Sequence, residues 1–181
     1  MLTPTLRSPS DLLNKLEREL WRAFHHRHPV HKADHFYNFC ITALALKDHF
    51  FEAKGVLTAA KATYFQQWNQ VSELVASTEV ANSTKHFVLR DRKTGALRPL
   101  KTMAVSPSTS RVIHVFESQN GELRLVDEAE APDMSVEFSG GKSVDLYEFM
   151  DAVVKYWQKF LASEGVSLSP QAASELYGEE T

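Results

Sequence analysis

The sequence predicts an α+β fold, a four-helix bundle with a small antiparallel β-sheet inserted before the last helix. Two observations support this prediction. Over the first half of the chain, apolar residues recur every three or four positions, as they do on one face of a helix. From His86 apolar and polar residues alternate, as in a strand, and the helical spacing returns at Ser143. Helices, a sheet and a final helix in that order are typical of an α+β domain.

The first predicted helix spans 10–26. Ser8 is the expected N-cap, Pro9 suits the first helical position, and the charge of Asp11 favours a helix N-terminus. Pro29 follows the expected end of the helix, because the residue before a proline disfavours the α conformation. The apolar stripe of this helix is formed by Leu12, Leu16, Leu20 and Phe24.

The second predicted helix spans 34–53, with Asp34 as its N-cap and Gly55 just after its end. It is apolar around much of its circumference, which favours a position near the centre of the bundle. The third predicted helix spans 57–77. Residues 78–85 either continue this helix or form a short separate turn.

The sheet is predicted between 86 and 139, with three to five strands. Its strongest signal is Asn120-Gly121 between the alternating runs 111–117 and 122–126, because Asn-Gly favours a hairpin turn. The other candidate strands are 86–90, 97–105 and 134–138, with predicted loops at 92–95, around Pro107 and at 139–142.

The final predicted helix spans 144–163, with Ser143 as its cap and Gly165 at its end. Residues 1–165 are expected to form a single domain, followed by a flexible polar tail over 166–181. Each of the five largest candidates for the core lies on the apolar stripe of its helix, and we expect them in one core: Trp21, Phe39, Trp68, Phe149 and Trp157.

The composition is that of a globular protein. The 181 residues include 20 Lys+Arg and 23 Asp+Glu, with 43% hydrophobic and 24% charged residues. These values exclude a disordered, collagen-like or disulfide-rich chain. The single cysteine, Cys40, forms no intrachain disulfide, and no secretory leader or run of about 18 apolar residues is evident. We therefore expect a cytoplasmic protein that has no membrane contact.

Five of the eight histidines fall within eleven residues, and they form the first candidate site. Neutral imidazole is a common metal ligand, and two of these histidines would share a helix face if the helix began early enough. The alternative is a solvated loop between two helices, because the segment has no cysteine and no His-Glu-x-x-His motif. The five residues are His25, His26, His28, His31 and His35.

Polar residues in the second predicted helix form another candidate. Asn38 and Thr42 are four residues apart and share a face, and Asp48 and His49 interrupt a Phe-rich sequence. A buried polar group costs about 1–3 kcal/mol if it has no partner, so a buried set would need partners near a site. The alternative is that Asp48 and His49 lie at the exposed end of the helix.

The turn 82–86 is the densest polar cluster of the chain. It could bind an anion, with His86 as acid or base and Lys85 holding phosphate. The alternative is a capped helix end in which Asn82 follows the last turn. A basic cluster comes next, and it forms either phosphate contacts or the solvated face of a hairpin. Its members are Arg90, Arg92, Lys93, Arg98 and Lys101.

Two of these regions resemble a family of uncharacterised bacterial and phage-associated proteins. The resemblance covers about residues 11–91, and it provides candidate positions but no reaction. The family has histidine and tryptophan where this sequence has Ala45 and His49. The matching motifs are Asn38-Phe39-Cys40-Ile41-Thr42-Ala43 with Leu46-x-Asp48, and Asn82-x-x-Lys85-His86-Phe87.

The chain is also faintly similar to HEPN domains, four-helix proteins that include many toxin and defence ribonucleases. Their signature is an arginine followed four to six residues later by histidine, often with asparagine after the arginine. Asn82 and His86 match the asparagine and the histidine, but Ala81 stands where the arginine should be. Lys85 would have to replace its charge, and lysine lacks the planar fork of arginine.

Two functional hypotheses follow. In the first, a small defence- or toxin-type protein acts on RNA or a nucleotide, without a cofactor. His86 is then the acid or base, Lys85 contacts phosphate, and Asn82 and Asp48 orient the reacting groups. In the second, the chain is a non-enzymatic protein- or ligand-binding module that forms a homodimer through its helices. Convergence of these four side chains in one pocket would distinguish the two hypotheses.

Overall fold

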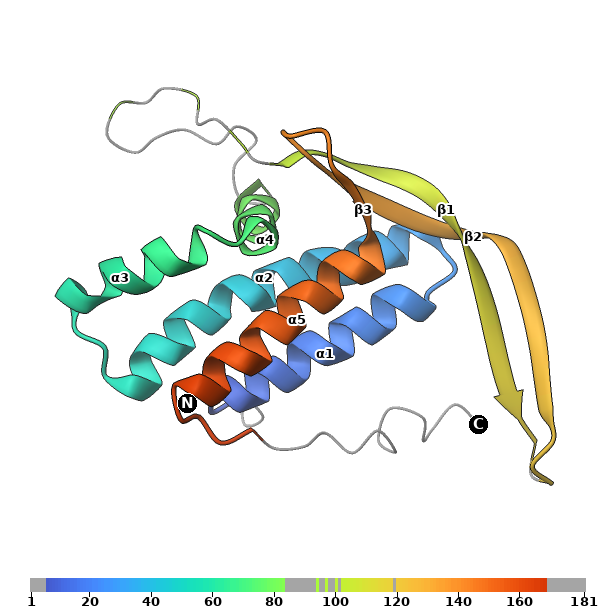
Figure 1. Cartoon of the computed structure of the whole chain (residues 1–181), viewed down its shortest axis with the longest axis horizontal. Helices are drawn as coiled ribbons and strands as arrows, with labels where there is room; N and C mark the ends of the chain where they lie inside the picture. Colours follow the sequence, from blue (N-terminus) through green and yellow to red (C-terminus); the bar gives the residue numbers. More distant parts are fainter. Residues whose placement is uncertain are drawn as a thin grey trace.

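The computed structural model consists of a helical body and a long β-ribbon that arches over one end of it (Figure 1). It describes residues 6–83, 94, 97, 100, 102–118 and 120–168. The sheet is antiparallel, with strand order β1-β2-β3. The α+β class is therefore confirmed. In chain order the elements are α1 (Pro9–His25), α2 (Pro29–Lys54), α3 (Thr58–Trp68), α4 (Ser72–Ser83), β1 (Thr102–Glu117), β2 (Leu123–Phe138), β3 (Ser143–Asp145) and α5 (Leu146–Ser163).

The helices α1, α2, α4 and α5 lie against one another (Figure 1). The core lies between them, and it is rich in aromatic side chains, including Trp68 at the end of α3. Four of the five predicted core residues are at most 1% exposed: Phe39, Trp68, Phe149 and Trp157. The fifth expectation is confirmed only in part, because Trp21 packs against this core from its edge. Trp21 is only half-buried, and its ring stacks on His25 one turn further along α1.

The helix starts follow the local chemistry of the sequence. Ser8 and Asp11 form a reciprocal capping box at the start of α1, as the sequence predicts. The start of α2 differs, because this helix begins at Pro29 and not at Asp34. A proline is well suited to the first helical turn, where its missing N–H has no helical partner. Pro29 therefore ends one helix and opens the next.

The predicted third helix is in fact two helices, so the described residues contain five helices and not four. The break follows Trp68, which is 1% exposed. Two i→i−3 bonds tighten the turn, from Gln70 N to Gln67 O at 3.1 Å and from Val71 N to Trp68 O at 3.2 Å. This turn lets α4 run in a different direction from α3 and pack on α2. The sequence has no glycine or proline at this position that would predict the turn.

The β-hairpin at Asn120-Gly121 is confirmed, and Gly121 adopts a positive φ of 82° in its turn. The loop predicted around Pro107 is wrong, because this residue lies inside β1. β1 is an edge strand, where a residue without an N–H is tolerated. The candidate strand 86–90 and the turn 92–95, except Thr94, lie outside the described residues, as do residues 169–181 of the predicted tail.

Val166 and Leu168 pack, half-buried, against the core after the end of α5. Among the residues that the structure describes, no helix combines the length and the apolar character needed to span a bilayer.

Candidate functional site

The structure describes only two of the four predicted site residues, and they lie on different helices. Asp48 is exposed on α2, and Asn82 is half-buried near the end of α4. Lys85 and His86 lie outside the described residues, as does the basic cluster of residues 90–101. Convergence of these four side chains therefore remains a prediction.

A different polar cluster is formed where α1 and α2 pack against each other. Polar residues of α2 follow a 4-3-4 spacing, which places them on one face of the helix. They meet polar residues of α1 that are also three and four positions apart. We call this set the polar seam, and it comprises His31, His35, Asn38 and Thr42 of α2 with Lys15, Glu19 and Arg22 of α1.

Glu19 is the centre of the polar seam. Its side chain is buried, with the residue 4% exposed, and it accepts bonds from both helices. Oε2 lies 2.9 Å from Nδ1 of His35, and Oε1 lies 3.1 Å from Nη1 of Arg22. Lys15 Nζ is 3.8 Å from the same Oε1. Three basic side chains thus gather on one carboxylate.

Lys15 also links the two helices through a hydroxyl. Its Nζ donates to Thr42 Oγ1 at 2.5 Å, and that hydroxyl donates to the carbonyl oxygen of Asn38 at 2.7 Å. Burial lowers the pKa of Lys15; Glu19 raises it, and Arg18 and Arg22 lower it further. The pKa of Lys15 therefore remains below its usual range even though a carboxylate lies beside it.

The histidine-rich segment covers the turn between α1 and α2. The ring centroid of His26 lies 4.9 Å from that of His31 and 5.4 Å from that of His35, and His28 lies 5.0 Å from His31. The pKa of His26 is lowered by partial burial and by the neighbouring histidines and Lys32. Within the described ranges, no three His, Cys, Asp or Glu side chains are placed to hold a metal ion.

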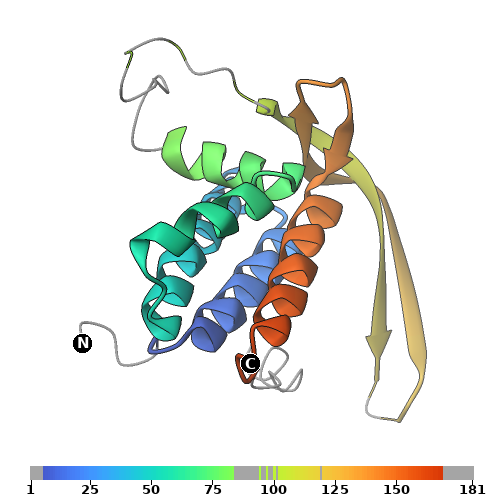
Figure 2. The same ribbon diagram turned by 60° about the vertical axis from the view of Figure 1, so that its left-hand side comes forward.

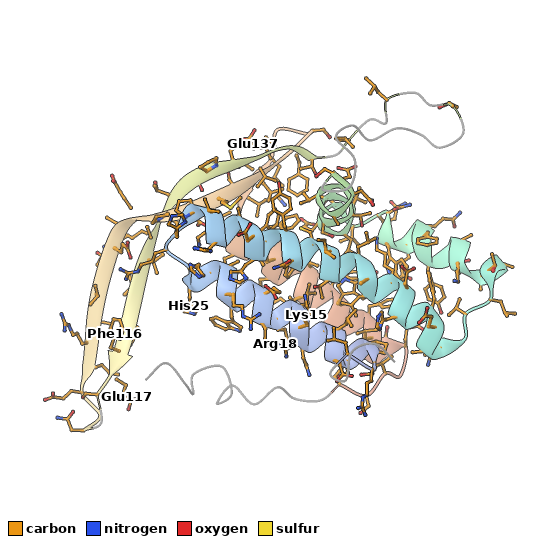
Figure 3. The ribbon with its side chains drawn as sticks, turned by 180° about the vertical axis from the view of Figure 1, so that it is seen from behind. Lys15, Arg18, His25, Phe116, Glu117 and Glu137 are labelled. Carbon is orange, nitrogen blue, oxygen red and sulfur yellow. The ribbon has the colours of Figure 1, made fainter. Side chains whose placement is uncertain are left out.

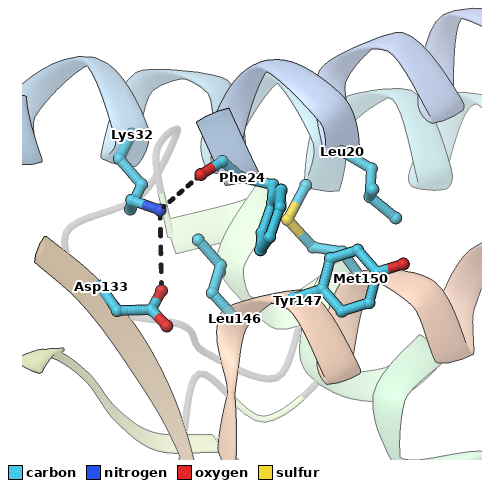
Figure 4. Close-up of a pocket in the computed structure, with 7 residues that line it drawn as sticks. All are labelled: Leu20, Phe24, Lys32, Asp133, Leu146, Tyr147 and Met150. Atoms are coloured by element: carbon cyan, nitrogen blue, oxygen red, sulfur yellow. Dashed lines mark hydrogen bonds and ion pairs between the residues drawn. The ribbon is translucent and has the colours of Figure 1, made fainter. Parts of the chain in front are cut away.

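A hollow lies between the α1–α2 turn and the ribbon, and a buried ion pair forms part of its lining. Lys32 Nζ lies 3.7 Å from Asp133 Oδ1 and donates to the carbonyl oxygen of Phe24 at 3.2 Å (Figure 4). Lys32 is only 4% exposed, so the pair fastens β2 to the helical body. At the rim of the hollow, Arg27 Nη2 lies 3.4 Å from Glu128 Oε2.

A second buried lysine lies further along α2, where this helix packs against α4. Lys47 Nζ donates to Thr78 Oγ1 of α4 at 2.8 Å and lies 5.7 Å from the ring centroid of Trp68. Burial lowers the pKa of this amine to about 8, although Asp48 partly opposes the effect. The hydrogen bond to Thr78 joins α2 to α4, so we assign Lys47 a structural role.

Sequence reasoning found half of the polar seam. It singled out His31 and His35 as members of the histidine-rich segment, and Asn38 and Thr42 as polar residues on one face of a mainly apolar helix. It missed their partners on α1. A signal existed, because Lys15, Glu19 and Arg22 follow a 4-3 spacing and share one face of the predicted helix. That face also carries Arg18 and His25, as Figure 3 shows along the α1 ribbon.

Comparison with known proteins identifies no relative. No protein-family model, curated protein or solved structure matches the chain.

Proposed function

We propose that the chain binds a phosphate-bearing ligand, RNA or a nucleotide, on the polar seam, with His35 as the group that transfers a proton. The observation that carries this proposal is the cluster around Glu19. Lys15, Arg22 and His35 contact a single buried carboxylate, which leaves a surplus of positive charge on this face at neutral and acidic pH. Phosphate groups are recognised by such surpluses of Lys and Arg.

The lowered pKa values of two groups support the proposal, because they indicate a face with more basic than acidic side chains. Lys15 belongs to the seam and His26 borders it beside His31 and His35. The pKa of each is lowered by burial and by basic neighbours. Both groups are therefore more easily charged when an anion is bound. Binding of phosphate would raise both pKa values, because a nearby negative charge favours the protonated form.

The contact with Glu19 supports a chemical role for His35. A buried carboxylate bound to one ring nitrogen fixes the orientation and the tautomer of an imidazole. Here the carboxylate holds Nδ1, so Nε2 is the nitrogen that would meet a ligand. The side chain is 22% exposed, which is enough for a ligand atom to reach it. General acid–base catalysis requires these conditions.

The binding experiment compares RNA with a nucleotide on the full chain. Fluorescence anisotropy with a labelled single-stranded RNA and with a labelled nucleotide distinguishes the two sources of phosphate. We expect Arg22→Ala to weaken binding about tenfold, the loss of roughly one charge-assisted contact. The matched control is Lys155→Ala, which removes an exposed lysine of α5 that pairs with Asp151. Equal affinities for wild type and Arg22→Ala would refute the proposal.

A second experiment separates binding from chemistry. Asn keeps a donor near the position of Nδ1, so His35→Asn retains the bond to Glu19 and removes Nε2. We expect this variant to bind like the wild type and to lose cleavage of RNA or hydrolysis of the nucleotide. If wild type shows no turnover while Arg22→Ala still weakens binding, the chain is a binding module, which is the second hypothesis from the sequence. Unchanged turnover in His35→Asn would remove His35 from the mechanism.

A further inference from the structure

The far half of the β-ribbon projects beyond the helical body. We call it the distal ribbon, and it comprises residues 111–117 of β1 and 123–128 of β2. In Figures 1 and 2 no helix covers its outward face. Four aliphatic side chains lie on that face, with exposed fractions from 56% to 66%: Ile113, Val115, Leu123 and Leu125. A two-stranded ribbon is marginally stable by itself, so this region lacks the support that a third strand would give.

The outer edge of β1 offers a regular backbone for pairing. β1 lies at the edge of the sheet, and its pairing with β2 shows an irregularity between Ser110 and Val112. There Ser110 faces Ala131 and Val112 faces Glu128, so the extra residue belongs to β2 and β1 continues without interruption to Glu117. An open edge of this kind is a template for a strand of another chain.

The alternation of hydrogen bonds indicates which groups point outward. At the hairpin end, Ser118 N donates to Glu122 O at 2.9 Å, which makes Ser118 and Glu122 a bonded pair. In an antiparallel ladder every second residue is bonded, so Val112, His114 and Phe116 direct their N–H and C=O groups to β2. Ile113, Val115 and Glu117 therefore direct theirs to the open edge.

The sequence of this edge is complementary to itself. If two copies pair antiparallel about His114, Arg111 lies opposite the partner's Glu117 and Ile113 lies opposite the partner's Val115. On the other face, Val112 lies opposite the partner's Phe116. Every pair away from the axis is thus either oppositely charged or apolar, and such cross-strand pairs stabilise a sheet. A shift of one residue loses the charge match.

We propose that two copies of this chain pair through their β1 edges, in an antiparallel register centred on His114, and form a continuous four-stranded sheet. The symmetry is two-fold, so each edge provides both halves of the contact. Residues 111–128, the distal ribbon with its turn, carry two arginines and four carboxylates, a balance that disfavours RNA or an anionic membrane as the occupant. Seven residues a side make a small interface, and we expect a weak dimer with a dissociation constant in the micromolar range.

Proline substitutions at two facing positions test the edge directly. Val115 and Leu125 face each other in the ribbon, and the N–H of each points away from the other strand. Val115→Pro removes a donor from the β1 edge, whereas Leu125→Pro removes one from the β2 edge. Prolines at such positions are compatible with a hairpin. Sedimentation equilibrium of the full chain should show a dimer for wild type and Leu125→Pro, and a monomer for Val115→Pro.

The charge match has its own test. Glu117→Arg places like charges opposite each other in the proposed register, and we expect dimer formation to weaken at least tenfold. Circular dichroism checks that each variant keeps its fold. A monomeric wild type at high micromolar concentration overturns the proposal. So does a dimer that persists in Val115→Pro, or one that is lost only in Leu125→Pro.

Discussion

The helical body and the distal ribbon are held together in different ways. In the body, residues that are distant in the sequence share one core, and the ring of Trp68 lies 5.5 Å from that of Trp157 and 5.6 Å from that of Phe160. In the distal ribbon, each residue is held mainly by the residue across the hairpin, and aliphatic side chains remain exposed. The body thus provides stability, and the ribbon offers a surface whose composition is little constrained by folding.

The largest effect is expected from the aromatic core. Trp157→Ala removes a side chain of α5 that is fully buried and packs against Trp68. The free energy of unfolding should fall by about 3–5 kcal/mol, because the lost contacts and the resulting cavity add together. Urea denaturation followed by circular dichroism measures this loss. A change below half a kcal/mol would mean that the body is not organised around this residue.

Two ion pairs, one at the helical body and one on the distal ribbon, test the difference in stability between these regions. Asp133→Ala leaves the buried Lys32 ammonium without its carboxylate, and we expect a loss of about 3 kcal/mol. Asp127→Ala breaks the pair with Arg111 on the exposed ribbon, and it should cost far less, because solvent screens an exposed ion pair. Thermal denaturation of both variants gives the two values. Equal losses would contradict the division between body and ribbon.

A pH effect should arise within the body, at Lys47. Its pKa is lowered from 10.5 to about 8 in the folded state, so the unfolded chain binds more protons between these values. The free energy of unfolding therefore rises with pH from about 8 to 10.5, by roughly 3 kcal/mol, and the whole gain is lost once the pH has fallen through the folded-state pKa of about 8. In Lys47→Met the rise should be smaller by this amount, and any rise that remains belongs to other lysines whose pKa is lowered, such as Lys15 and Lys32. Denaturation curves of both proteins across this range measure the difference.

The smallest effect is expected in the distal ribbon. Leu123→Ser changes a side chain that is 66% exposed, and stability should change by less than about 0.5 kcal/mol. The measurement is made at low protein concentration, so that any association of chains does not contribute. A loss above 1 kcal/mol would show that the ribbon is part of the core after all.

The sequence predicted the types of most elements because buried side chains impose their own period, 3.6 residues in a helix and two in a strand. Two features of the fold could not be predicted from this periodicity. The division between α3 and α4 follows from the packing of Trp68 and α4 on α2, which is a tertiary effect. The passage of β1 through Pro107 depends on its place at the edge of the sheet, and a local pattern does not contain that information.

The same distinction applies to the candidate site. The spacing of His35, Asn38 and Thr42 within one helix was visible in the sequence. The carboxylate that holds His35 comes from Glu19, sixteen positions earlier and on another helix. That contact exists only because α1 and α2 pack antiparallel with a particular rotation. The predicted roles of Lys85 and His86 remain predictions.

The place of α5 in the core has a consequence for the newly made chain. Trp68 and Phe50 lie 92 and 110 positions before Phe160 of α5, yet both pack against its ring, with centroids 5.6 Å and 5.0 Å away. During synthesis the first four helices therefore emerge with these rings uncovered, and they stay so until the ribbon and α5 have followed. Domains whose decisive contacts are distant in sequence fold slowly and expose apolar surface while they wait. A chaperone that binds exposed aromatic segments would therefore bind the first four helices of the growing chain.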